Sequence, residues 1–204
     1  MLTDLSPLIL DLTGLDDAAI EALGFKTYCD YYLQTFNRGM FLAHDGEPVY
    51  FFRSTAKTHC LHQTIDGIKG PICPVRVARV KWIKEFISGN VAKSELWLVP
   101  DKRGFDKRCY FSQEHGHVVW LSPRDQDWSF KTAYAATPEY IRRKVKTVEG
   151  AELVCRFNLP EISSSEQSQP SLQSDSVSAT TEPLPEPALP CLTPDDSEPV
   201  REGS

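Results

Sequence analysis

The sequence lacks the features that would assign it to a membrane or secreted class. No apolar run approaches the roughly 18 residues that a membrane-spanning helix needs. The stretch from Met1 to Asp11 has no basic segment of the kind that opens a secretory signal. The six cysteines are scattered without a CxxC pair, so we expect reduced thiols. Together these absences predict a soluble, cytoplasmic protein that does not bind membranes.

Motifs for several kinds of catalysis are also missing. The chain has no glycine-rich phosphate loop, no GxSxG turn and no paired acidic metal-binding motif. His59 and His62 flank Cys60, and Cys73 follows, but no second close pair of ligands supplies the spacing of a zinc site. We therefore expect no metal and no cofactor. Nucleotide-triphosphate chemistry and two-metal nuclease chemistry both lack support.

Basic residues are scarce at both ends of the chain and abundant in its middle. Residues 51–150 carry 18 Lys and Arg against 10 Asp and Glu, a local charge of about +8, although the whole chain carries -6. Residues 1–50 carry 2 basic against 8 acidic residues, and residues 161–204 carry 1 against 9. A positive segment attracts phosphate-rich polymers, which acidic flanks repel. The middle of the chain is therefore the candidate functional part.

Composition divides the chain into one domain and a tail. Residues 1–160 are long and apolar enough for a single α+β domain, whose basic core spans 45–150. Residues 161–204 are rich in Ser, Pro and Glu, with almost no aliphatic cluster to offset the entropy of ordering them. We predict a disordered acidic tail. The tail is either a solvated extension with no role in activity, which is the commoner case, or it lies transiently on the basic segment.

Hydrophobic periodicity predicts helices first and strands later. A capped helix is expected at 16–23, a second helix or irregular segment at 25–36, a strand at 49–52 and a loop at 67–74. Period-two patterns then predict strands at 95–99, 108–112, 117–121 and 129–135, followed by a helix at 138–145. The fold class is α+β: N-terminal helices pack on a four-stranded antiparallel sheet whose other face is partly open.

The clearest helix is predicted at 75–87, where apolar residues form one broad arc. Arg79 lies inside this arc. Burying a guanidinium lowers the folding stability by several kcal/mol, about as much as the loss of an ion pair. The cost is avoided when the group is paired or faces a polar cleft. Arg79 is thus either a structural ion-pair residue or a functional one. In the last strand, strict alternation predicts that Phe130, Thr132 and Tyr134 share one face.

The order of these features resembles a known group of nucleases. The chain presents His59, then the helix Arg76-Val-Ala-Arg79-Val, the strand Arg108-Cys-Tyr110, the strand Val118–Leu121 and a terminal Phe130-Lys-Thr-Ala-Tyr134. This order resembles the phage-associated branch of the barnase, EndoU, colicin and RelE-like (BECR) group of ribonuclease folds. The resemblance covers about residues 45–145.

The resemblance implies a metal-independent endoribonuclease, in some members a toxin, that cleaves RNA by attack of a 2′-OH on phosphorus. Position by position, the implied catalytic residues are His59, Arg79, Arg108, Thr132 and Tyr134. His59 would act as base or acid and the two arginines as a phosphate clamp. Thr132 would donate to phosphate, and Tyr134 would stack on a base or give a proton. The expected substrate-binding residues are Arg76, Lys84, Tyr110 and Lys131.

Two other functions fit the same charge pattern. One is an RNA-binding module without activity, in which Trp97, Tyr110 or Tyr134 would stack on bases. The other is a protein-interaction domain whose basic face binds an acidic partner, such as an inhibitor protein or the tail of this chain. Cleavage of RNA in the absence of metal would separate the nuclease from both.

Overall fold

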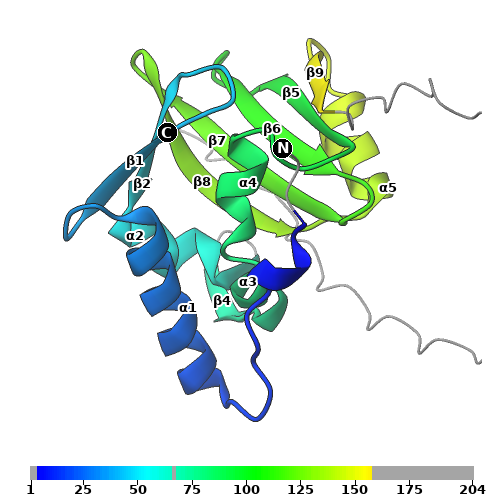
Figure 1. The fold of residues 1–204 in the computed structure, drawn as a ribbon. Helices are drawn as coiled ribbons and strands as arrows, with labels where there is room; N and C mark the ends of the chain where they lie inside the picture. Colours follow the sequence, from blue (N-terminus) through cyan, green and yellow to red (C-terminus); the bar gives the residue numbers. More distant parts are fainter. Residues whose placement is uncertain (1–3, 66–67, 158–204) are drawn as a thin grey trace, which may run out of the picture.

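The chain forms a mixed β-sheet with helices on both of its faces (Figure 1). The computed structural model describes residues 4–65 and 68–157, and the tail predicted at 161–204 lies outside this range. Within the described residues, no helix is long and apolar enough to cross a membrane. The α+β class is confirmed.

Seven strands form the sheet, in the order β1-β2-β8-β7-β6-β5-β9. All neighbouring pairs are antiparallel except β2 and β8, which run parallel. The strands of the sheet are β1 (Arg38–Leu42), β2 (Pro48–Phe52), β5 (Ser94–Pro100), β6 (Asp106–Ser112), β7 (His117–Arg124), β8 (Asp127–Ala135) and β9 (Glu152–Phe157). A separate hairpin consists of β3 (His62–Ile65) and β4 (Ile68–Ile72).

The helices are short apart from α1, which has 16 residues. They are η1 (Ser6–Leu8), α1 (Asp17–Tyr32), α2 (Arg53–Thr55), η2 (Ala56–Cys60), α3 (Pro74–Ala78), α4 (Trp82–Ile87), α5 (Pro138–Ile141) and η3 (Arg142–Lys146). The Asp16 carboxylate caps α1 by accepting from the Ala19 amide at 2.8 Å. This helix runs past the end expected at residue 23, and Gly24 lies buried inside it, where a Cβ would come within 2.8 Å of a Val77 methyl.

The prediction of a four-stranded sheet is wrong. The four expected strands correspond to β5 to β8, but β1, β2 and β9 extend the sheet to seven. β2 and β9 join it through partners far away in the sequence, which local periodicity does not reveal. The loop expected at 67–74 instead includes β4, because a hairpin outside the main sheet tolerates Gly70 and Pro71.

The continuous helix predicted at 75–87 is also wrong, because it breaks between α3 and α4. Arg79 lies in the break, with φ -100° and ψ 11°. The buried Tyr32 hydroxyl donates to the Val80 carbonyl at 2.8 Å and accepts from the Lys84 amide at 3.3 Å. One side chain of α1 thus satisfies two backbone groups that the break releases.

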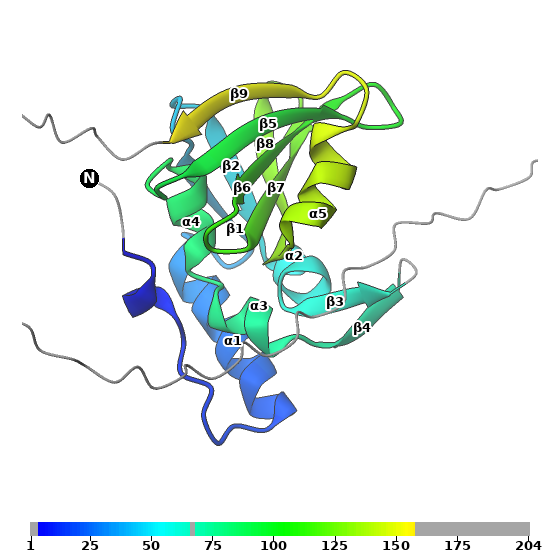
Figure 2. The ribbon, with the colours of Figure 1, turned by 90° about the vertical axis from the view of Figure 1, so that its right-hand side faces the viewer.

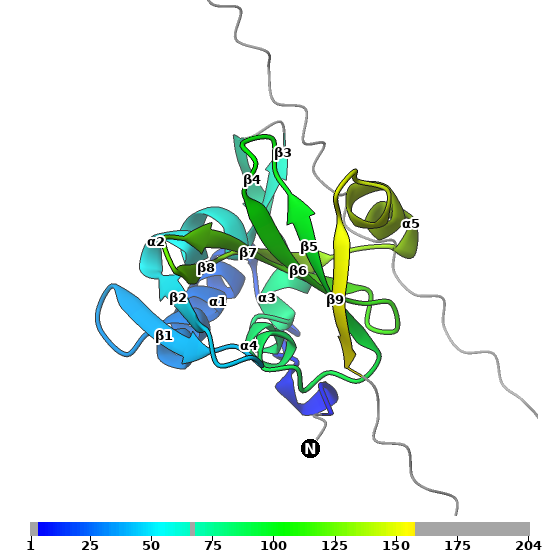
Figure 3. The same ribbon diagram turned by 90° about the horizontal axis from the view of Figure 1, so that it is seen from above.

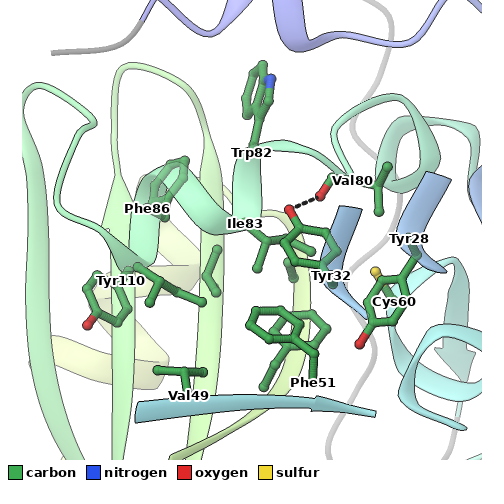
Figure 4. Packing of buried hydrophobic residues seen from close by; sticks show 14 of the residues in the cluster. Tyr28, Tyr32, Val49, Phe51, Cys60, Val80, Trp82, Ile83, Phe86 and Tyr110 are labelled. Carbon is green, nitrogen blue, oxygen red and sulfur yellow. Dashed lines mark hydrogen bonds between the residues drawn. The ribbon is translucent and has the colours of Figure 1, made fainter. Parts of the chain in front are cut away.

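Two hydrophobic clusters lie on opposite faces of the sheet. The larger one joins the sheet to α1, α3 and α4, and its centre is a stack in which the rings of Tyr32 and Phe51 are 4.6 Å apart (Figure 4). The smaller one lies under α5 and η3 and contains Phe111, Tyr140 and Ile141. Figure 2 shows α5 on the face away from α1 and α4. Seen from above, α5 lies beside β5 and β9, far from β1 and β2 (Figure 3).

We predict that Gly39→Ala destabilises the protein strongly. A Cβ at Gly39 would lie 1.8 Å from the Tyr32 carbonyl oxygen, so strand β1 has to move away from the end of α1. We expect the free energy of unfolding to fall by about 2–3 kcal/mol in urea denaturation. Gly104→Ala is the control, because Gly104 has φ +77° and open space around it, so only the backbone cost of about 1–2 kcal/mol applies. Equal losses in the two variants would contradict this interpretation.

Candidate functional site

The candidate site lies at the edge of β8 where β2 diverges. β2 pairs with β8 only at Val49 with Trp128 and at Tyr50 with Ser129. Among the described strands, none pairs with residues 130–135 on this side, and η2 lies there instead. The Thr132 hydroxyl donates to the His59 carbonyl at 2.7 Å and so fixes η2 against the strand. A gap in strand pairing therefore brings His59 to the sheet.

A bulge in β8 decides which side chains face this edge. Trp120 of β7 pairs with Thr132 and the next residue, Leu121, pairs with Phe130, so Lys131 has no partner across the ladder. The expectation that Phe130 shares a face with Thr132 and Tyr134 is wrong, because the bulge reverses the alternation. Phe130 packs in the larger cluster, and Tyr134 in the smaller one on the other face.

Arg76 is the buried cation of the site. It is 6% exposed, and its Nη1 donates to the His62 carbonyl at 2.6 Å and to the His59 carbonyl at 3.3 Å. Its guanidinium carbon also lies 5.1 Å from the centre of the Tyr134 ring. Arg76 thus connects α3 with η2, β3 and β8, and its burial leaves almost none of its surface exposed.

His59 is the titratable group at the surface of the site. It is half-buried, and burial lowers its pKa below 6.5, with further lowering by the positive charges of Lys131 and Arg76. A neutral imidazole at physiological pH can accept a proton. Lys131 is exposed on the bulge and supplies a cation beside it.

Thr132 and Tyr134 belong to the site but are engaged in structural hydrogen bonds. The Tyr134 ring is 8% exposed, and its hydroxyl bonds the Tyr140 hydroxyl at 2.6 Å and accepts from Trp120 Nε1 at 3.0 Å. Burial raises its pKa well above 10. Tyr134 is therefore inaccessible for stacking on a base, against the sequence expectation, and Thr132 already donates to the backbone of His59.

Arg79 lies on the other side of α3. It is half-buried, its guanidinium carbon is 4.7 Å from the centre of the Trp82 ring, and its Nη1 donates weakly to the His115 carbonyl at 3.3 Å. Next to it, His117 is 1% exposed, and neither of its ring nitrogens has a hydrogen-bond partner among the described residues. Burial lowers the pKa of His117 well below 6.5, and the charges of Arg79, His115 and Arg76 lower it further.

Arg108, Tyr110 and Lys84 lie apart from this site. Arg108 Nη2 pairs with Asp45 at 2.6 Å and with Glu47 at 3.1 Å, and its guanidinium lies over the ring of Trp128. Tyr110 is fully buried, and its hydroxyl lies 3.3 Å from His44 Nδ1. Lys84 lies 4.9 Å from the centre of the Phe41 ring. Arg108 is held by Asp45 and Glu47, whereas Arg79 contacts Trp82 and the His115 carbonyl, so a clamp made of Arg79 and Arg108 is not assembled.

The described residues contain no group of three or more His, Cys, Asp or Glu side chains arranged to hold a metal ion. The five cysteines in this part of the chain are free thiols, among them Cys60 and Cys73 next to the site.

The chain was compared with protein-family models, with curated proteins and with solved structures. No match was found. The resemblance to BECR ribonucleases stays a prediction, and function has to be argued from geometry.

Sequence reasoning missed one residue that the structure draws attention to, His117, and the setting of another, Lys131. Lys131 was expected to contact substrate, but its position on a bulge beside His59 was not foreseen. His117 was missed altogether, because a histidine in an alternating strand carries no signal of how its nitrogens are satisfied. The pairing of His117 with Ala135 places it near the end of β8, under the break that contains Arg79.

We expect Lys131→Met to raise the pKa of His59. The wild-type pKa should lie below 6.5, and loss of the nearby positive charge favours the protonated imidazole. NMR titration of the His59 ring measures both values. Lys57→Met is the control, since Lys57 lies on the same helical turn but is not among the charges that lower this pKa. If the two variants shift the pKa equally, the bulge does not direct Lys131 toward His59.

We also expect His117 to make the fold sensitive to acid. The unfolded chain protonates this ring near pH 6.5 while the native state keeps it neutral, so stability falls as pH drops below about 6.5. His117→Leu removes this linkage. The melting temperature of the variant should fall less than that of the wild type between about pH 7.5 and about pH 5.5. An unchanged pH dependence would show that the pKa of His117 is the same in the native and unfolded states, which contradicts this interpretation.

Proposed function

We propose that this protein is a metal-independent endoribonuclease whose proton-transfer residue is His59. The observation that carries the proposal is the meeting of three groups at the edge of β8 that has no strand partner in the described part of the chain and is packed against η2. They are a half-buried histidine with a lowered pKa, an exposed lysine and a buried arginine: His59, Lys131 and Arg76. They come from η2, the β8 bulge and α3, and the two cations account for part of the lowered pKa.

The chemistry needs only these residue types. Neutral His59 takes the proton of a ribose 2′-OH while that oxygen attacks the adjacent phosphorus, and the bond from phosphorus to the 5′ oxygen breaks. The 5′ oxygen takes a proton from water, so the products are a 2′,3′-cyclic phosphate and a 5′-OH. Lys131 can neutralise a phosphate oxygen directly, and the buried charge of Arg76 favours the extra negative charge of the phosphorane. Arg76 also holds η2 in place, so it is a positioning residue as well.

The second candidate is RNA binding without cleavage. It is favoured by the state of the two hydroxyl groups at the site: Thr132 donates to the His59 carbonyl, and Tyr134 is bonded to Trp120 and Tyr140. Neither hydroxyl is available to protonate the leaving group. This alternative predicts that RNA binds to the same edge of β8 and is released without being cleaved.

The test is incubation of the full chain with total RNA in EDTA, followed by analysis of the new ends. We expect fragments that carry 2′,3′-cyclic phosphate. His59→Gln should reduce the cleavage rate at least about a hundredfold, because general acid–base catalysis contributes about 10²–10⁴ to such reactions. The melting temperature should stay close to that of the wild type.

His44→Gln is the matched control, because His44 is also half-buried but contacts Tyr110 on the face of α4. It should cleave like the wild type. Full activity in His59→Gln would overturn the assignment of the proton-transfer residue. Intact RNA with tight binding would support the non-catalytic alternative instead.

A further inference from the structure

A strip of arginine and aromatic side chains lies on the same sheet face as α5, at the end of the sheet that α5 does not cover. It consists of Arg38, Tyr50, Phe52, Arg53 and Arg124, and we call it the arginine–aromatic strip. The guanidinium carbons of Arg38 and Arg124 each lie 5.3 Å from the centre of the Tyr50 ring. Arg124 also lies 5.2 Å from the centre of the Phe52 ring. None of these contacts belongs to either hydrophobic cluster.

Strand geometry puts the strip on one face. Val49 and Phe51 of β2 point into the larger cluster, so Tyr50 and Phe52 point the other way. Across the hairpin, Arg38 pairs with Phe52 and Met40 with Tyr50, so these side chains lie on the same outer face. Met40 and Leu42 are 42% and 58% exposed, which shows that this face is uncovered.

The strip continues to the candidate site. Tyr50 pairs with Ser129 of β8, three residues before Thr132, a separation of about 10 Å along the strand. At the end of β2, Arg53 lies 4.5 Å from the centre of the exposed Phe36 ring, and Lys57 follows at the start of η2. A ligand that follows the strip therefore reaches Lys131 and His59.

The charges of the strip are not neutralised by neighbours. Within the described residues, Arg38, Arg53, Lys57, Arg124 and Lys131 form no salt bridge with a carboxylate. Around β5, β6, β9 and α5 several cations pair with acidic residues instead: Lys93 with Glu114, Lys107 with Asp101, Arg142 with Glu139, and Lys146 and Arg156 with Glu95. Free positive charge thus gathers where aromatic rings are exposed.

We infer that the arginine–aromatic strip binds single-stranded RNA and guides it to His59. Bases stack on aromatic rings and on guanidinium planes, and unpaired cations bind the phosphates between them. A folded acidic partner would use the charges but would not need the aromatic rings that lie beside them. The inference rests on the proposed function in one respect, namely that RNA is the ligand.

The test measures the affinity of the full chain for short single-stranded 2′-O-methyl RNA by fluorescence anisotropy. This RNA has no free 2′-OH and cannot be cleaved by the proposed reaction, so binding is read apart from catalysis. We expect Tyr50→Leu to weaken binding about tenfold through loss of a stacking surface. Arg124→Gln should weaken binding and lower the slope of log affinity against log salt by about one.

The controls are Phe105→Leu and Arg103→Gln, which remove an exposed ring and an exposed charge from the turn between β5 and β6. They should bind like the wild type, and all four variants should keep the wild-type melting temperature. The inference is overturned if the strip variants bind like the controls, or if wild type binds no RNA. It is also overturned if Tyr50→Leu only dissociates a dimer seen by light scattering.

The two proposals can fail separately. Strip-dependent binding without any cleavage of ordinary RNA would overturn the ribonuclease function and leave the strip in place. Cleavage that depends on His59, with unchanged KM in Tyr50→Leu and Arg124→Gln, would support the ribonuclease function and overturn the RNA-binding role of the strip.

Discussion

The buried guanidinium of Arg76 is the interaction on which the candidate site depends. A charge at 6% exposure needs strong partners, and the carbonyls of His59 and His62 and the ring of Tyr134 supply them. These partners belong to η2, β3 and β8, so one side chain from α3 holds three segments in a fixed arrangement. The stability cost of the buried charge is offset by contacts that also place His59 beside the sheet.

The second constraint is the short parallel pairing of β2 with β8. Two residue pairs attach β2, and with it β1, to the sheet. Among the described residues, the later half of β8 has no strand partner on this side and contacts η2 instead. The same divergence opens the outer face of β1 and β2, because α5 covers only the other end of the sheet. The proposed site and the proposed RNA path thus both result from the short pairing of β2 with β8.

Electrostatics follows this division. Glu95 pairs with Lys146 and Arg156 near β5, β9 and α5, and Asp45 and Glu47 hold Arg108 on the face of α4. The cations along β1, β2 and the β8 bulge have no such partners among the described residues. A chain with an overall charge of -6 can therefore present a positive face on one side.

The sequence by itself determined the α+β class, the strands β5 to β8 and the basic middle of the chain, because alternation and charge are local properties. It also indicated His59, Thr132 and Lys131. Tertiary structure decided the rest. The β8 bulge placed Phe130 and Tyr134 on opposite faces, the break at Arg79 was stabilised by Tyr32 from a distant helix, and Arg108 was paired away from the site. Each of these depends on an interaction with another element, and such interactions leave no trace in the periodicity of a single segment.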